Sequence, residues 1–224
     1  MVNKRVIAIA LLILGMSIFG KLLYVLSKNI KLDEFHKAAV VFILDTSQSN
    51  QSGLAQQIQY LKSLCAILDP EDEIKILKVA NDSYLIYEGS PADTKGINGA
   101  ISAYSKSDGQ KDRGTAYPQA IKKAVGHCLT MKKEGYVPSI VVVGDLEDGN
   151  NPKTQINWDV LPKNIQKTKQ YIPELAMMFV YAPAPKLDLV KTNLNPVLGE
   201  KKLIIANSVG ASKANTKFLK AIGR

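Results

Sequence analysis

A short apolar run that ends in a cluster of oxygen-bearing side chains constrains this chain more than any other feature. Residues 40–44 read Val-Val-Phe-Ile-Leu, and Asp45, Ser47 and Ser49 follow at alternate positions. A continuous apolar run of this length indicates a strand buried on both faces, as at the centre of a parallel sheet. Open α/β folds bind their ligands at the carboxyl ends of such strands. One carboxylate and two hydroxyls at that edge suit a hard cation such as magnesium.

Beyond this run, patterns typical of strands alternate with patterns typical of amphipathic helices. Apolar residues make up 46% of the chain and charged residues 22%, so a packed core is expected. The alternation predicts an α/β fold with a doubly wound, mostly parallel central sheet flanked by helices. The predicted strands are 39–44, 74–79, 83–87, 140–143, 175–181 and 202–206, with a hairpin at 81–82. The predicted helices are 54–68, 94–104, 117–129, 154–170 and 214–222.

The start of the chain differs in composition from this predicted domain, which covers residues 38–224. Residues 1–5 form a basic head, residues 6–26 are mostly apolar with Lys21 as their one charged residue, and residues 27–37 form a polar connector. As a helix, residues 6–26 would be about 31 Å long at roughly 1.5 Å per residue, enough to cross a hydrocarbon core. We therefore expect one N-terminal transmembrane helix. Because no small-x-small cleavage site follows, an uncleaved anchor is favoured over a signal peptide.

Charge near the predicted anchor gives an expectation about its orientation. Basic residues lie on both sides of the apolar segment, so the positive-inside bias is nearly balanced. A short basic head usually stays inside, which would place the folded domain on the non-cytoplasmic side. We expect a single-pass membrane protein with that orientation.

The remaining charged and metal-binding residue types exclude several classes of function. The formal net charge is +9, of which residues 1–37 contribute +4 and residues 38–224 contribute +5. The second value is typical of a solvated Lys-rich surface, and without an Arg-rich or aromatic-interleaved run no nucleic-acid partner is predicted. Cys65 and Cys128 lie on the apolar sides of predicted helices, which indicates core thiols. His36 and His127 are too far apart in the sequence to predict a zinc site.

Three polar segments fall where predicted strands end or helices begin. Asp45-x-Ser47-x-Ser49 follows the first strand, Gly114-Thr115 precedes helix 117–129, and Asp145 follows strand 140–143. In a parallel sheet these positions would converge on one edge. In this order and spacing, residues 38–222 resemble the von Willebrand factor type A (VWA) domain family, with its metal-ion-dependent adhesion site (MIDAS).

The resemblance implies a role for each of these residues. Ser47 and Ser49 would ligate Mg²⁺ or Mn²⁺ through their hydroxyls, and Thr115 would do so directly or through water. Asp45 and Asp145 would hold coordinating waters. An Asp or Glu carboxylate of a protein partner would fill the remaining position. The resemblance thus implies a membrane-anchored interaction module for adhesion or complex assembly, and not an enzyme.

This sequence departs from the family pattern at two places. Gln48 stands where the family usually has glycine between the two serines. The usual Thr-Asp-Gly after the later strand is here Gly144-Asp145-Leu146, and Glu147 and Asp148 add acidic groups beside it.

Two other functions fit parts of the same pattern. A strand followed by Asp45, with a later Gly144-Asp145-x-x-Asp148, also resembles Mg²⁺-dependent phosphatases of the haloacid dehalogenase type. That chemistry normally needs a second aspartate as general acid at position 47, where this chain has serine. A degenerate VWA domain that binds a partner without metal is the second alternative.

Overall fold

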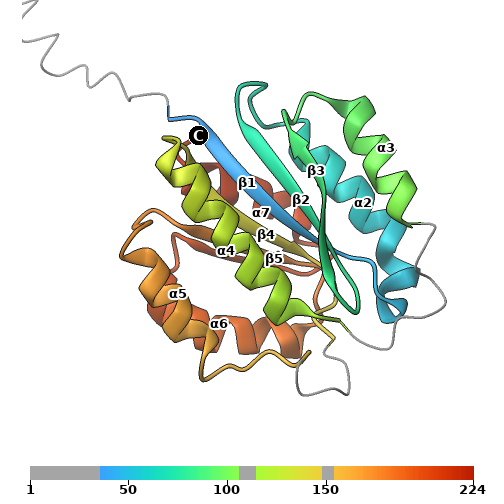
Figure 1. Cartoon of the computed structure of the whole chain (residues 1–224). Coiled ribbons are helices and arrows are strands. Elements are labelled where there is room, and N and C mark those ends of the chain that lie inside the picture. Colours follow the sequence, from blue (N-terminus) through green and yellow to red (C-terminus); the bar gives the residue numbers. More distant parts are fainter. Residues whose placement is uncertain (1–35, 106–114, 148–153) are drawn as a thin grey trace, which may run out of the picture. The chain divides into compact units, whose positions relative to one another are not determined.

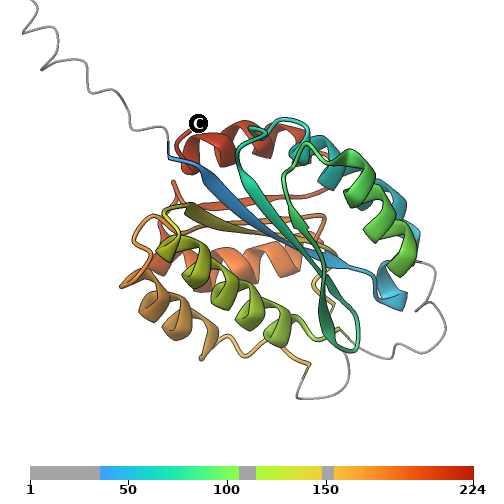
Figure 2. The same cartoon turned by 45° about the horizontal axis from the view of Figure 1, so that its top comes forward.

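A single six-stranded sheet with helices on both faces forms the body of the protein in the computed structural model (Figures 1 and 2). The structure describes residues 36–105, 115–147 and 154–224, and Lys37–Arg224 forms one compact unit. The strand order is β3-β2-β1-β4-β5-β6, and every neighbouring pair is parallel except β2 and β3. The prediction of a doubly wound, mostly parallel α/β sheet is confirmed.

The strands are β1 (Ala38–Asp45), β2 (Glu73–Val79), β3 (Ser83–Gly89), β4 (Val137–Val143), β5 (Ala176–Val180) and β6 (Leu203–Ala206). The helices are η1 (Gln48–Asn50), α2 (Gln51–Cys65), α3 (Thr94–Ser105), α4 (Tyr117–Lys133), α5 (Leu161–Lys169), α6 (Ala184–Leu198) and α7 (Ala211–Ala221).

Strand β1 lies at the centre of the sheet, and all of its residues are buried. Its side chains alternate between two cores because successive residues of a strand point to opposite faces. Val41 and Ile43 pack with α4, α5 and α6, whereas Phe42 and Leu44 pack with α2, α3 and α7. Burial on both faces explains why the sequence of β1 is apolar without interruption.

Some predicted boundaries were wrong, and one helix was missed. Residues 154–160 precede α5 as turns, so the helix predicted over 154–170 is shorter than expected. Helix α6 was not predicted, because the prolines at its start indicated a loop. Pro185 lies in the first turn of α6, where a missing N–H costs nothing, and Pro196 lies in its last turn. Strand β4 begins at Val137, earlier than predicted, and includes Pro138.

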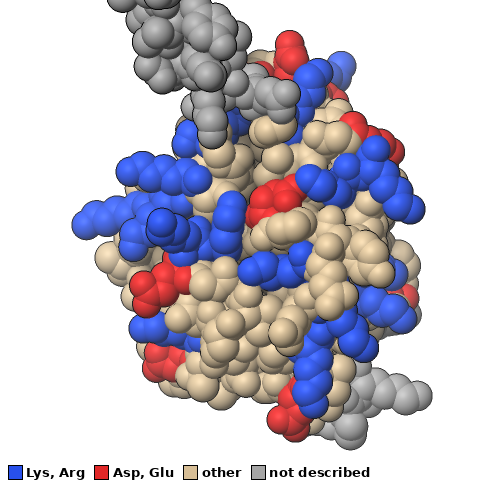
Figure 3. Space-filling model, turned by 90° about the vertical axis from the view of Figure 1, so that its left-hand side faces the viewer, with Lys and Arg blue, Asp and Glu red and all other residues tan. Residues whose placement is uncertain are grey.

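The surface carries charges of both signs. On the face at the left of Figure 1, Lys and Arg side chains are numerous, with Asp and Glu and broad uncharged areas between them (Figure 3). Such mixing is typical of a solvated Lys-rich surface. Within the described ranges, no helix is both long enough and apolar enough to cross a membrane. The anchor predicted over residues 6–26 lies outside those ranges.

Candidate metal centre

The ends of β1, β2 and β4 bring the three predicted segments to one edge of the sheet. Leu44 of β1 pairs with Val143 of β4, so Asp45 and Gly144 are the next residues on neighbouring strands. The segment 115–117 is held at the same edge, because the N–H of Ala116 donates to the carbonyl of Ala80 just after β2, at 2.7 Å. The convergence expected from the sequence therefore occurs.

The loop after β1 brings two serine hydroxyls together above the buried carboxylate. The Ser47 N–H donates to Asp45 Oδ1 at 2.8 Å, which folds the loop back over the strand end. The Ser47 and Ser49 hydroxyl oxygens lie 3.1 Å apart. Ser47 is buried and Ser49 is exposed, so the pair extends from the protein interior to the surface. Two hydroxyl oxygens thus lie side by side at the predicted positions.

Gln48 fits this loop without strain, although the family usually has glycine there. Among the described residues other than glycine, positive φ occurs at Leu146 and Tyr181, and not at Gln48. Gln48 starts the short helix η1, and its side chain is exposed. This departure from the family pattern therefore leaves the loop geometry intact.

A buried amide pair fixes the loop against the first turns of α2. Asn50 Nδ2 donates to the carbonyl of Asp45 at 2.7 Å and to Gln57 Oε1 at 2.6 Å. Gln57 Nε2 donates in return to Asn50 Oδ1. Since the predicted ligands Ser47 and Ser49 lie between Asp45 and Asn50, these bonds restrict the segment that carries them.

Tyr117, which the sequence did not indicate as a site residue, contacts the same cluster. Its hydroxyl donates to Asp45 Oδ2 at 2.6 Å and accepts from the Leu146 N–H at 3.1 Å. Tyr117 is fully buried at the start of α4. Helix α4 is therefore tied to the segments after both β1 and β4, and Thr115, two residues before Tyr117, is buried beside them.

The segment after β4 is shaped around this tyrosine. A Cβ at Gly144 would lie 2.4 Å from the Tyr117 hydroxyl and 2.5 Å from Asp45 Cβ, so the position has no room for a side chain. Leu146 is buried and has a φ of 56°, in the left-handed region that favours glycine. Leu146, which stands where the family usually has glycine, thus adopts a backbone conformation that favours glycine.

Two acidic groups, Asp45 and Asp145, act on each other at this edge. Burial raises the pKa of the Asp45 carboxyl to about 7, and the charge of Asp145 adds to the rise, against the hydrogen bonds from Tyr117 and Ser47. Asp145 is half-buried, and its Oδ1 accepts from the Glu147 N–H at 2.8 Å. The pKa of Asp45 is thus set by its burial, by Asp145 and by the hydrogen bonds from Tyr117 and Ser47.

These residues fit a divalent cation by their chemistry. The hydroxyls of Ser47 and Ser49 are hard oxygen donors, and the carboxyl groups of Asp45 and Asp145 lie close enough to act on each other at the same edge. Within the described ranges, no group of three or more His, Cys, Asp or Glu side chains could hold a metal.

Comparison with known proteins agrees with this geometry. A model of the von Willebrand factor type A domain family matches residues 40–150. The chain carries a VWA domain. The match includes Asp45, Ser47, Ser49, Thr115 and Asp145, and the family resemblance predicted from them is confirmed. No curated protein matches the chain.

Several solved structures share the fold of this VWA domain. An aerotolerance-related membrane protein from Bacteroides fragilis is 16% identical, with a TM-score of 0.55 and coverage of 83% of this chain and 98% of the other. The pilus adhesin SpaC from Lactobacillus rhamnosus is 11% identical, with a TM-score of 0.61 and coverage of 84% and 30%. Proximal thread matrix protein 1 from the mussel byssus, solved with zinc in its MIDAS motif, is 13% identical, with a TM-score of 0.53 and coverage of 84% and 47%.

At these identities the likeness concerns the fold. The chain spans about half the length of the mussel protein, with 48% of it covered in one crystal form. VWA domains commonly mediate protein interactions and are typically not enzymes, which agrees with the prediction of a binding module.

Proposed function

We propose that the VWA domain binds a divalent cation, Mg²⁺ or Mn²⁺, at the edge formed by Asp45, Ser47, Ser49, Thr115 and Asp145, and through it an acidic residue of a protein partner. The observation that supports this most is the pair of Ser47 and Ser49 hydroxyl oxygens, which lie 3.1 Å apart next to the buried Asp45. When bound, the cation supplies an electrophilic centre that accepts a carboxylate oxygen.

Each residue of the site has its own proposed task. Ser47 and Ser49 would hold the cation through their hydroxyls, and Thr115 would complete the set from the segment just before α4. Asp45 accepts hydrogen bonds from Ser47 and Tyr117, so it orients the ligand loop more than it offers a free oxygen. Asp145 is half-buried and can hold water at the site. Neutral hydroxyl ligands leave positive charge for the carboxylate of the partner.

The environment of Asp45 argues against the phosphatase alternative. A nucleophilic carboxylate needs an oxygen that can reach a phosphorus atom. Asp45 is fully buried, and each of its oxygens accepts a hydrogen bond. Position 47 also lacks a general acid, because it is a serine, whose hydroxyl contacts that of Ser49.

We further propose that residues 6–26 anchor the protein in a membrane and that residues 38–224 lie on the non-cytoplasmic side. The apolar composition of residues 6–26 and their basic flank support the anchor. A domain tethered in this way would meet its partner at the membrane surface, in adhesion or in assembly of a complex.

Thermal unfolding of the full-length chain in detergent tests the metal site. Millimolar Mg²⁺ or Mn²⁺ is expected to raise the Tm, since a ligand at about 100 times its Kd stabilises by ~2.7 kcal/mol. The double variant Ser47→Ala/Ser49→Ala should lose this rise. Ser52→Ala, at an exposed position of α2, should keep it. If neither metal changes the Tm of the wild-type protein, the proposed metal site is contradicted and a degenerate VWA domain is favoured.

Capture of partners from solubilised membranes tests the acidic contact. We expect partner proteins to bind the VWA domain in Mg²⁺ and to be released by chelator. Such a partner should no longer bind when the Asp or Glu that contacts the metal is changed to Asn or Gln. Partners that stay bound in chelator to Ser47→Ala/Ser49→Ala would contradict a metal-bridged contact.

A further inference from the structure

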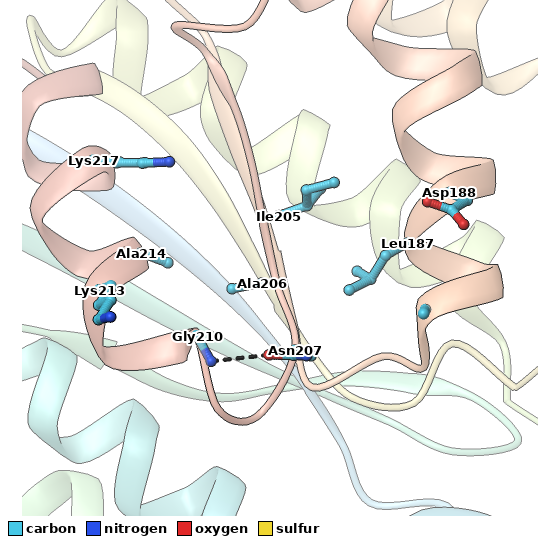
Figure 4. Close-up of a pocket in the computed structure, with 10 residues that line it drawn as sticks. Leu187, Asp188, Ile205, Ala206, Asn207, Gly210, Lys213, Ala214 and Lys217 are labelled. Atoms are coloured by element: carbon cyan, nitrogen blue, oxygen red, sulfur yellow. Dashed lines mark hydrogen bonds between the residues drawn. The ribbon is translucent and has the colours of Figure 1, made fainter.

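A groove runs along the outer edge of β6, where none of its lining residues belongs to the candidate metal centre. Its volume is about 410 Å³, and β6 lies between the two helices that wall it (Figure 4). Leu187 of α6 packs on one face of the sheet and Ala214 of α7 on the other, and both line the groove together with Ile205 and Ala206 of β6. The floor of the groove is therefore the edge of the sheet.

The backbone of β6 presents hydrogen-bonding groups to this groove. Within the described part of the chain, β6 has a sheet neighbour, β5, on one side only. The carbonyls of Lys202 and Ala206 accept from the N–H groups of Met177 and Tyr181, so the groups of these residues point toward β5. In a parallel ladder the alternate residues point the other way. The N–H and C=O of Ile205 therefore face the groove, as a template for another strand.

The two walls differ in charge and polarity. Lys213 and Lys217 lie on α7, are exposed, and form no ion pair with any described residue. Figure 4 shows Lys217 extending from α7 toward β6, while Leu187 extends from α6 on the other side. The α6 wall also carries Asp188. Val209, which precedes the lining residue Gly210, is 88% exposed. One wall thus favours acidic side chains, and the other offers an apolar contact.

We propose that this groove binds an extended segment of a partner protein, with alternating acidic and apolar residues, as a seventh strand beside β6. Successive side chains of a strand point to opposite faces, so alternate residues would meet α7 and α6. Acidic residues would face Lys213 and Lys217, and apolar residues would face Leu187. Main-chain bonds to Ile205 would provide affinity, and the two walls would provide selectivity. This inference does not depend on the proposed metal site.

Fluorescence anisotropy with a labelled alternating Glu-Val peptide tests the proposal on the full-length chain in detergent. We expect saturable binding that persists in chelator, and weaker binding of a Lys-Val peptide of equal length. Lys213→Glu/Lys217→Glu should weaken binding of the Glu-Val peptide by about tenfold or more. Lys163→Glu/Lys167→Glu, with the same spacing and charge change at exposed positions of α5, is the matched control and should leave binding unchanged.

Ile205→Pro tests strand addition itself. Proline removes the outward N–H of Ile205 but no bond to β5, and edge strands tolerate it for this reason. Binding should be lost while the Tm stays near that of wild type. If Ile205→Pro fails to fold, the comparison of Lys213→Glu/Lys217→Glu with its control on α5 still tests whether the peptide binds in the groove.

Other outcomes would overturn the proposal. Equal losses in the α5 and α7 lysine variants would mean that the peptide responds to net charge alone. Loss of peptide binding in chelator would indicate that the peptide binds at the metal site and not in the groove. A sedimenting dimer that dissociates in Lys213→Glu/Lys217→Glu would mean that a second copy of the chain covers the edge.

Discussion

The hydroxyl of Tyr117 joins Asp45 and Leu146 at the carboxyl edge of the sheet. Tyr117→Phe would leave a buried carboxylate oxygen and a buried N–H without this partner, at a cost of about 1–3 kcal/mol for an unsatisfied group. Chemical denaturation of the variant should show a loss of this size. Tyr171→Phe, at a side chain that is 70% exposed, should change stability by less than about 0.5 kcal/mol. Equal stability of the two variants would contradict a structural role for the Tyr117 hydroxyl.

Gly144 illustrates a second constraint on single residues. Gly144→Ala would place a Cβ within 2.5 Å of the Asp45 and Tyr117 side chains, and overpacking of this kind costs about 1–3 kcal/mol. Gly126→Ala in α4 is the control, because a Cβ there meets nothing within 4 Å. Replacing a helical glycine should instead stabilise the protein by roughly 0.5–1 kcal/mol. The paired denaturation curves should therefore move in opposite directions, and a shift of both in the same direction would contradict the close packing at Gly144.

At the scale of elements, the sequence predicted those helices and strands whose apolar residues recur with a regular local spacing. The buried run of β1 and the apolar spacing of α2 and α4 were sufficient to locate those elements. Helix α6 has the same kind of spacing, with Leu187, Val190, Leu194 and Leu198 buried, and this signal could have located it despite its prolines.

The candidate site was predictable only in part, for a different reason. Asp45, Ser47 and Ser49 are close in sequence, so one loop carries them. The bond between Tyr117 and Asp45 joins residues 72 positions apart and depends on how α4 packs on the sheet. In the sequence, the available sign of this contact was the glycine at position 144. A glycine alone does not indicate which side chain occupies the space beside it, and the structure shows that this side chain is Tyr117.

The buried faces of α2 and α4 make a prediction about thiol chemistry. Burial raises the pKa of the Cys65 thiol to about 12 and that of Cys128 further. A raised thiol pKa lowers the thiolate fraction, so neither should react with a thiol reagent at a pH of about 8 in the native protein. Both should react in denaturant. Val209→Cys, at an 88% exposed position, should label at once as a control. Rapid labelling of native wild-type protein would contradict the core assignment.

At the scale of the whole molecule, the proposed anchor decides where the VWA domain works. If residues 6–26 span a membrane, the wild-type chain should remain in the membrane pellet after alkaline carbonate extraction. Leu12→Arg/Leu14→Arg should release it, because an arginine near the centre of a membrane helix costs roughly 2.5–3.5 kcal/mol. Ile67→Arg/Leu189→Arg changes two exposed apolar residues of the domain, 46% and 43% exposed, and should leave the chain in the pellet.

Orientation follows from protease protection in the same membranes. In sealed vesicles with the non-cytoplasmic face outward, added protease should digest residues 38–224, and in inverted vesicles it should not. The opposite pattern would place the VWA domain in the cytoplasm, and its acidic partner would have to be sought there. If carbonate extracts the wild-type protein from the membranes, the proposal that residues 6–26 form a membrane anchor is wrong. Neither result would alter the metal response expected from Ser47 and Ser49, because those residues lie in the folded unit Lys37–Arg224.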